Sequence, residues 1–452
     1  MHGPAKEQLA IKIDGVLLQA IEKSEDLNQL FNLAEHYGKF HWLNTTSRWA
    51  CPEVERHVFH KVSSAITTNG KTVTKGAITH VLSEGYDVGG HTPLCVNLAK
   101  EQAQRGEHVQ LVITRNVTPN VASDIKQSGI ATHICSGSHL EKLNSLTNLF
   151  LQSKAVVLHI HPDDIVACCA AIFAEREGIP CLFVNHADIH FSYGPSQCST
   201  VLEISAGSWL STQAFRHPKS QSFLGIPCTD LNVSNEPTED KVTGNYFITV
   251  GGAHKYHLDN STIFVDFVEE LCGKLDEKLK IIGVGNATPF SKLSDKAKRN
   301  LEILGTQTRD ATIRQMRNAK AYIDSFPEGG GTSVTNAMLL CLPIFGCKAK
   351  GGMFGDDYLS ASTTELIDRI QHFRKDGPNI KKLQERAEFI RKTFSLKTCA
   401  DRLESTIAGG RLQVPFDFQA DEIDLTFYQK QWLSSERFYV PPFIKINSPK
   451  QQ

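Results

Sequence analysis

Short apolar runs alternate with helical segments in two separate stretches of the chain, and this rhythm constrains the fold more than any other feature. In residues 76–230 the runs read AITHVLS, VQLVIT, AVVLHIH and CLFVNHA. In residues 245–410 they read YFITVGG, LKIIGVGN, LEILGT, AYIDSF and LPIFG. Strands that alternate with helices form parallel sheets with both faces covered. The sequence therefore predicts an α/β protein with two doubly wound, Rossmann-like domains.

Two flanking regions and a linker complete the predicted organisation. Residues 1–75 show helical periodicity, which predicts an N-terminal helical region that either shapes an acceptor cleft or, as we prefer, packs against the first α/β domain. In residues 229–244, Pro, Asn and charged residues replace the apolar periodicity, so we predict an interdomain linker. Residues 411–452 form an aromatic-rich tail. We expect its helix to cross back to the first domain rather than lie on the surface, because Phe427, Trp432 and Phe438 are too apolar to remain in water.

The composition fits two globular domains and excludes several kinds of partner. The 452 residues are 40% hydrophobic and 21% charged, and 48 Lys and Arg against 49 Asp and Glu give a formal net charge of -1. No bulk field therefore favours nucleic acid or an anionic membrane. The N-terminus lacks an apolar signal segment and no run approaches the ~18 apolar residues of a membrane span, so we expect a cytoplasmic protein. The 12 scattered cysteines contain no C-x2-C pair, which predicts buried free thiols.

A glycine-rich turn follows the apolar run 321–326 and opens directly into a helical segment. From Glu328 the sequence reads EGGGTSVTNAM. Glycines let the backbone approach a ligand closely, and a helix N-terminus offers free N–H groups to an anion such as a diphosphate. Glu328 and Asn336 stand eight positions apart, and we expect Asn336 two turns into the helix, so that one residue reaches a sugar and the other a ribose. The alternative is a structural turn that binds nothing.

A second glycine turn lies upstream, in the segment 86–114. Here GYDVGGHTPLCVNLAKEQAQRGEHVQLVIT runs from a turn at Gly89, Gly90 and His91 through an amphipathic helix into an apolar strand. The strand that follows the helix is expected to be buried on both faces. Both predicted domains therefore carry a glycine turn between a strand and a helix.

These two turns resemble those of the GT-B glycosyltransferases, which use nucleotide-diphospho-sugars. The segment from Glu328 is similar to their E-x7-E donor-binding signature with Asn336 in place of the second Glu, and RGEHV at 105–109 is similar to the end of their first helix. The resemblance implies two Rossmann-like domains that face a cleft, with the donor bound by the C-terminal one. Besides the turn at 89–91, it assigns donor binding to Gly251, Gly252, His254, Lys255, Gly285, Asn286, Gly305, Thr306, Glu328, Gly329, Gly330, Gly331, Thr332, Ser333 and Asn336.

Four histidines follow two of the apolar runs in the first α/β stretch. His159 and His161 end one run, and His186 and His190 follow the next. Ligands bind at the carboxyl ends of strands in open α/β sheets, so His161 and His186 are candidates to position an acceptor or take its proton. The segment 186–188 is similar to an acceptor-side segment of bacterial glycosyltransferases of the protein-modifying type, and this resemblance adds Asp188. The alternative for each histidine is a core or surface residue bonded to the backbone.

Charge stabilisation is expected to come from the protein. The resemblance places a cation after the run 246–250, and Lys255 fits that role because a cation there stabilises the departing diphosphate. The acid pairs 163–164 and 356–357 lack a third ligand, so no metal site is predicted.

The expected function is transfer of a hexose or N-acetylhexosamine from a nucleotide-diphosphate sugar, with UDP favoured, to a protein or glycan acceptor. Neither a permanently bound cofactor nor a metal is expected. Two alternatives remain. A sugar-nucleotide epimerase would carry acid–base residues around the sugar in place of an acceptor groove. A non-catalytic partner subunit would keep the fold and lose the phosphate site, whereas here the glycines, Thr332, Ser333 and Lys255 are all present.

Overall fold

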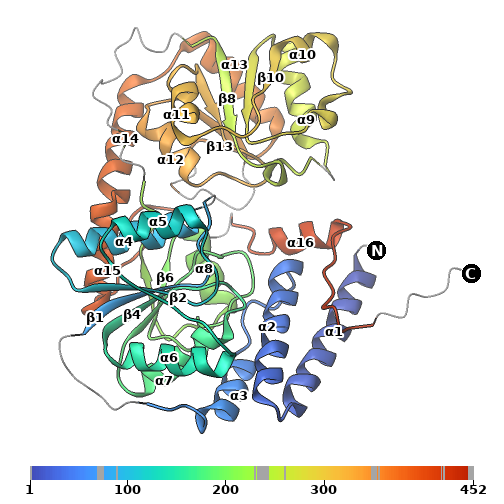
Figure 1. The fold of residues 1–452 in the computed structure, drawn as a ribbon. Helices are drawn as coiled ribbons and strands as arrows, with labels where there is room; N and C mark the ends of the chain where they lie inside the picture. Colours follow the sequence, from blue (N-terminus) through green and yellow to red (C-terminus); the bar gives the residue numbers. More distant parts are fainter. Residues whose placement is uncertain are drawn as a thin grey trace, which may run out of the picture.

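A computed structural model describes residues 3–68, 76–87, 90–228, 231, 244–258, 261–347, 354, 357–418, 420 and 423–445. Three parts are visible in Figure 1: an N-terminal helical region, an α/β domain beside it, and a second α/β domain above both. Most of the predicted linker 229–244 lies outside the described residues. No helix in the described ranges combines the length and apolar character that a membrane crossing requires.

The N-terminal helical region consists of α1 (Pro4–Lys23), α2 (Leu27–Asn44) and α3 (Pro52–Ser63). It packs against the first α/β domain, because the core that contains Phe31, Tyr37 and Phe59 continues into the apolar side chains of α7 (Ile165–Arg176). Polar contacts join the same parts: the Tyr193 hydroxyl donates to the Ala34 carbonyl at 2.8 Å, and the buried Glu55 accepts from the Gly194 amide at 2.7 Å.

The first α/β domain is built on a parallel sheet of seven described strands in the order β3-β2-β1-β4-β5-β6-β7. The strands are β1 (Ala77–Leu82), β2 (Val109–Ile113), β3 (Ala131–Ile134), β4 (Ser153–His159), β5 (Cys181–Val184), β6 (Thr200–Glu203) and β7 (Gln221–Phe223). The helices besides α7 are α4 (His91–Gln104), α5 (Pro119–Gln127), α6 (His139–Leu151) and α8 (Ala206–Phe215). Side chains alternate along β4: Val156 and Leu158 face the core of α6 and α7, whereas Ala155 and Val157 face that of α4.

The second α/β domain repeats this plan with six described strands in the order β10-β9-β8-β11-β12-β13. The strands are β8 (Tyr246–Val250), β9 (Lys278–Ile282), β10 (Leu301–Ile303), β11 (Ala321–Ile323), β12 (Ile344–Cys347) and β13 (Leu359–Ser360). The helical elements are η2 (Ala253–Tyr256), α9 (Ile263–Val268), η3 (Glu269–Lys274), η4 (Thr288–Phe290), α10 (Asp295–Asn300), α11 (Arg309–Arg317), α12 (Thr332–Leu339), α13 (Thr363–Asp376) and α14 (Ile380–Phe394). The six strands of this sheet therefore have the same order as β1 to β6 of the first domain, which adds β7 at one edge.

The chain returns to the first domain earlier than the predicted boundary at residue 410. Helix α15 (Leu396–Ile407) buries Cys399, Ala400 and Leu403 against α4 and the first sheet, and Arg105 of α4 pairs with Asp401 at 2.6 Å. The last helix, α16 (Phe427–Ser434), lies between the second domain and the N-terminal helices (Figure 1). Its Trp432 is buried and stacks on Phe438.

All 12 cysteines lie in the described part of the chain and are free thiols, and all but Cys228 and Cys347 are buried. The predicted buried free thiols are thus confirmed for the other ten positions.

Candidate functional site

The strand order of each sheet reverses at one place, and these two places locate the candidate site. The reversals fall between β1 and β4 in the first domain and between β8 and β11 in the second. In open parallel sheets the loops that leave the strands at such a point separate and leave a crevice for a ligand. We call the second-domain crevice the donor corner and the first-domain crevice the histidine corner.

The glycine turn of the donor corner folds over a buried acid. Asp324, one residue beyond β11, accepts a hydrogen bond of 2.8 Å from the Gly330 amide. Burial raises the pKa of Asp324 to about 7, against the lowering effects of the Gly330 amide and the Lys255 charge. A side chain at Gly330 would meet the Ser333 hydroxyl at 2.5 Å and the Asp324 carboxylate at 2.9 Å. A larger residue here would therefore displace the Ser333 or Asp324 side chain.

Helix α12 follows this turn, and its N-terminus belongs to the donor corner. The N-cap is Gly331, which has no capping side chain, and Thr332 is the first helical residue. The expected position of Asn336, two turns into the helix, is wrong: α12 begins four residues after Glu328, so Asn336 is only its fifth residue. The Asn336 side-chain oxygen is nevertheless buried without a hydrogen-bond partner among the described atoms.

The loop after β8 lies beside the glycine turn. The Lys255 ammonium donates to the Gly329 carbonyl at 3.1 Å, and the Glu328 amide donates to the Lys255 carbonyl at 3.1 Å. Gly251 packs closely, since a side chain there would meet the Tyr256 hydroxyl at 3.1 Å. The tertiary structure thus brings the predicted cation to the predicted phosphate turn across 74 residues of sequence.

The remaining predicted donor residues lie on the same side of the second sheet. Gly252 is the N-cap of η2 and precedes the exposed His254. Gly285 has open space around it, while the Asn286 side chain accepts from the Thr288 amide at 2.9 Å. Gly305 adopts a φ of 65° and is followed by the exposed Thr306. These loops follow β8, β9 and β10, so they border the edge that carries the glycine turn.

Glu328 is held by a histidine that the sequence reading missed. The Nε2 atom of His257 lies 2.8 Å from a Glu328 carboxylate oxygen, and its Nδ1 atom lies 3.1 Å from the Gln431 side-chain oxygen of α16. His257 has a left-handed φ of 50°, which is uncommon for a residue other than glycine. The tail of the chain therefore contacts the donor corner.

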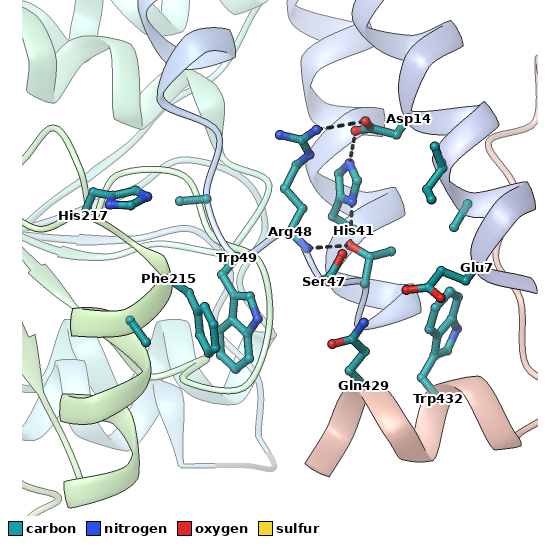
Figure 2. A pocket seen from close by; sticks show the side chains of 15 residues that line it. Glu7, Asp14, His41, Ser47, Arg48, Trp49, Phe215, His217, Gln429 and Trp432 are labelled. Carbon is teal, nitrogen blue, oxygen red and sulfur yellow. Dashed lines mark hydrogen bonds and ion pairs between the residues drawn. The ribbon is translucent and has the colours of Figure 1, made fainter. Parts of the chain in front are cut away.

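A cavity of about 420 Å³ borders α16 where Gln429 and Trp432 project (Figure 2). Gln429 and Trp432 of α16, Glu7 of α1 and the stacked pair Trp49 and Phe215 line it. The cavity therefore adjoins the N-terminal helices and α8, and it contains none of the predicted donor residues.

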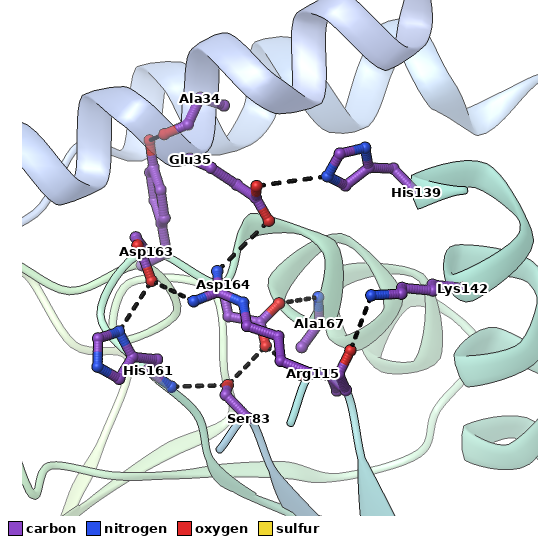
Figure 3. A network of polar contacts seen from close by, with 12 residues as sticks. Ala34, Glu35, Ser83, Arg115, His139, Lys142, His161, Asp163, Asp164 and Ala167 are labelled. Carbon is purple, nitrogen blue, oxygen red and sulfur yellow. Dashed lines mark hydrogen bonds and ion pairs between the residues drawn. The ribbon is translucent and has the colours of Figure 1, made fainter. Parts of the chain in front are cut away.

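His161 occupies the histidine corner and is oriented by a carboxylate (Figure 3). Its Nδ1 atom lies 2.9 Å from Asp163, which also accepts from Arg115 at 2.8 Å. Burial raises the pKa of Asp163, but the hydrogen bonds and charges of His161 and Arg115 outweigh burial and lower this pKa to about 2. Because the carboxylate can only accept, Nδ1 carries the proton and Nε2 of the neutral ring keeps its lone pair.

The neighbouring acid has a structural role. Asp164 caps α7 through the Ala167 amide at 3.1 Å and accepts from the hydroxyls of Ser83 and Thr114 at 2.6 and 2.5 Å. Both acids of the pair 163–164 therefore have protein partners. The other pair is not comparable, because Asp356 lies outside the described residues.

His186 is packed more tightly than His161. Its ring stacks on His91 with centroids 3.9 Å apart, and His91 bonds the His159 carbonyl at 2.7 Å. Burial lowers the pKa of His186 well below its ordinary value and that of His91 to about 4. Both rings are therefore neutral near pH 7. Of the glycine turn before them, Gly90 is exposed at the N-cap of α4, whereas Gly89 lies outside the described residues.

The segment after β5 is held by α8. The Ser205 hydroxyl donates to the Asp188 carboxylate at 3.3 Å, and His190 lies 3.3 Å from the Thr45 hydroxyl. The buried Arg216 donates to the carbonyls of Ala187 and His190, which fixes the loop from the inside.

A buried series of hydrogen-bonded side chains lies next to the histidine corner and was not predicted from the sequence. His159 Nε2 lies 3.1 Å from His80 Nδ1, and His80 Nε2 lies 2.7 Å from the Gln102 side-chain oxygen. Burial lowers the pKa of His80 to about 4. His80, His159 and Cys95 are residue types that can bind a metal, and within the described ranges their ligand atoms lie within 4.8 Å of one another. The hydrogen-bond chain accounts for their burial.

Comparison with known proteins identifies the architecture. No protein-family model matches the chain, and no curated protein matches its sequence. A glycosyltransferase from Rickettsia africae has a similar structure, with a TM-score of 0.57 and 10% identity over 74% of this chain and 99% of that one. Anabaena HepE in complex with UDP has a TM-score of 0.56 and 14% identity, over 74% of this chain and 100% of that one. The O-GlcNAc transferase of Thermobaculum terrenum has a TM-score of 0.52 and 12% identity, over 89% of this chain and 84% of that one.

The paired parallel sheets with the same order of six strands define a two-domain, doubly wound α/β protein. More particularly, the chain has the GT-B fold of the glycosyltransferases, with an N-terminal helical region added. The fold predicted from the sequence is thereby confirmed.

Proposed function

We propose that the protein transfers a hexose or N-acetylhexosamine from a nucleotide-diphosphate sugar to a protein or glycan acceptor. The observation that carries this proposal is the donor corner, where the N-terminus of α12, the glycine turn and Lys255 converge beside the strand-order reversal of the second sheet. Backbone N–H groups at a helix N-terminus together with a cation suit a diphosphate. UDP is favoured as the nucleotide because HepE, of similar fold, was solved with UDP.

In this proposal the donor corner stabilises the leaving group. As the glycosidic bond breaks, negative charge builds up on the diphosphate, and Lys255 with the first amides of α12 offsets it more strongly than in the ground state. Because protein groups supply this charge, the proposed reaction needs no divalent metal. Glu328 contacts hydroxyl groups of the donor sugar, and the loops at 285–286 and 305–306 hold the nucleotide.

His161 is a better candidate than His186 to accept a proton from the acceptor. Asp163 fixes the tautomer of His161 so that Nε2 can act as a base. The His186 ring, in contrast, is stacked on His91, and burial disfavours its protonated form. In the proposed mechanism His161 therefore takes the proton, while His186 and Asp188 shape the acceptor side.

A donor screen tests this function. UDP, GDP, ADP and CMP compounds, alone and as sugar conjugates, are added to the full chain and the midpoint of thermal unfolding is measured. A ligand at 100 times its Kd stabilises the native state by about 2.7 kcal/mol, and we expect the UDP compounds to give the largest rise. Release of UDP from the best donor then reports turnover, in the presence and absence of EDTA. If no nucleotide-diphosphate sugar raises the midpoint, the proposal is wrong.

A further inference from the structure

Helix α16 is anchored to the N-terminal helical region at its C-terminal end. The buried Lys6 of α1 donates to the carbonyls of Trp432 and Ser435, the latter at 2.8 Å. The Gly3 amide donates to the Leu433 carbonyl at 3.0 Å. Cations and N–H donors satisfy the free carbonyls at the end of a helix, so these bonds fix where α16 lies.

The same helix reaches the donor corner through one side chain. Gln431 is 3.1 Å from His257 Nδ1, and His257 Nε2 is 2.8 Å from Glu328. The His257 side chain is 8% exposed, so water competes little for either bond. Gln431 and Glu328 together leave the imidazole ring little freedom to rotate, because each holds one of its two nitrogens.

The chemistry of the ring makes this contact directional. Both partners present oxygens that only accept, a carboxylate and an amide oxygen, so His257 donates from Nε2 to Glu328 and from Nδ1 to Gln431. Gln431 holds Nδ1 on the opposite side of the ring and so aims the Nε2–H bond at the carboxylate. This bond occupies one oxygen of Glu328 and sets the orientation of the other, which is the group that the proposed function assigns to the donor sugar.

We propose that Gln431 is a positioning residue that acts through His257 to orient Glu328, so that recognition of the donor sugar depends on the C-terminal helix. This inference rests on the proposed function, because it takes Glu328 as the sugar contact. It goes beyond that function in making α16, and through Lys6 the N-terminal helices, part of the donor specificity. Recognition of the nucleotide, which uses other loops, is independent of Gln431.

The test compares UDP-glucose with UDP in binding calorimetry on the full chain. Gln431→Leu removes the amide at nearly constant size, and we expect UDP-glucose affinity to fall about tenfold while UDP affinity stays within about twofold. Gln431→Glu keeps an oxygen that accepts from His257 and is expected to retain sugar discrimination. Gln429→Leu, the same change two positions earlier on the cavity side of α16, is the matched control and is expected to leave both affinities unchanged.

A double-mutant cycle separates positioning from general destabilisation. In a Glu328→Ala background, Gln431→Leu is expected to cause no further loss of UDP-glucose affinity, because its effect passes through Glu328. Equal losses for UDP and UDP-glucose, or full additivity with Glu328→Ala, would overturn the positioning role alone. If the unmodified chain binds neither UDP-glucose nor UDP, this inference falls, and the proposed function falls with it only if no other nucleotide-diphosphate sugar raises the unfolding midpoint.

Discussion

The two α/β domains share the order of six strands, yet they fill the crevice at the reversal in different ways. In the first domain, side chains occupy it: His91 stacks on His186, and Asp163 and Arg115 surround His161. In the second, the backbone forms it, with an exposed Gly329 and an uncapped helix N-terminus. Free N–H groups at a helix N-terminus attract an anion, whereas the neutral rings of His91 and His186 do not. This contrast supports the proposal that the donor binds to the second domain.

Burial also shifts the pKa values of the two corners in opposite directions. Burial lowers the pKa of His80 to about 4 and raises that of Asp324 to about 7. In both cases the charged form is disfavoured by loss of water. Stability is therefore lost at the first corner as the pH falls from 6.5 to about 4, and at the second as the pH rises from 3.8 to about 7.

Of the changes predicted for the two corners, removal of the Lys255 ammonium should have the largest effect. We expect Lys255→Ala to lower the rate of UDP-glucose turnover 10²- to 10³-fold, about 3 to 4 kcal/mol, because the departing diphosphate loses its positive partner. Steady-state kinetics measures the rate, and circular dichroism checks that the fold is kept. Lys381→Ala, at a side chain 87% exposed on α14, serves as control. Unchanged turnover in Lys255→Ala would remove this residue from the mechanism.

Acid should destabilise the protein by protonating His80, next to the histidine corner. The pKa of His80 is lowered from 6.5 to about 4. The free energy of unfolding is therefore unaffected by this residue above pH 6.5, and it decreases as the pH falls from 6.5 to about 4. The loss amounts to about 3 kcal/mol. Urea unfolding between these pH values should show a weaker acid dependence in His80→Gln than in the unmodified protein. The exposed His133→Gln should keep the original dependence, and an equal change in both variants would contradict this assignment.

Closing the glycine turn should affect only the donor corner. A side chain at Gly330 would meet the Ser333 hydroxyl at 2.5 Å and the Asp324 carboxylate at 2.9 Å, so Gly330→Ala must displace these side chains at the start of α12. We expect UDP to bind about tenfold more weakly, the equivalent of one lost hydrogen bond to the anion. Binding calorimetry measures this, with Gly15→Ala in α1 as a control that has open space for the methyl group. Equal UDP affinity in both variants would place the anion elsewhere.

The smallest expected effect is on the pH dependence of donor binding. Ionisation of Asp324 as the pH rises through about 7 places a negative charge beneath the glycine turn, which opposes a diphosphate. UDP affinity should therefore fall a few-fold more steeply between about pH 6 and pH 8 in the unmodified protein than in Asp324→Asn. If UDP affinity depends on pH in the same way in both proteins, the charge of Asp324 does not affect UDP binding.

Strong local patterns were readable from the sequence, and weak ones were not. The runs around β1, β2, β4 and β5 and those around β8 to β12 were predicted because each contains the short apolar segment that is typical of a parallel strand. Strand β3 was missed because its four residues are exposed, and β13 because it has only two. Of the donor corner, the turn and Lys255 followed from spacing and resemblance, but His257 did not, since its partners lie 71 and 174 residues away.

The sequence by itself determined the two-domain α/β architecture and the glycine turn, because apolar periodicity and glycine act over a few neighbouring residues. Only the tertiary structure decided that His161 is oriented by Asp163 whereas His186 is stacked on His91, and that Gln431 reaches the donor corner from the end of the chain. These contacts depend on how helices and sheets pack. Side-chain hydrogen bonds between distant segments leave no periodic trace in a single sequence.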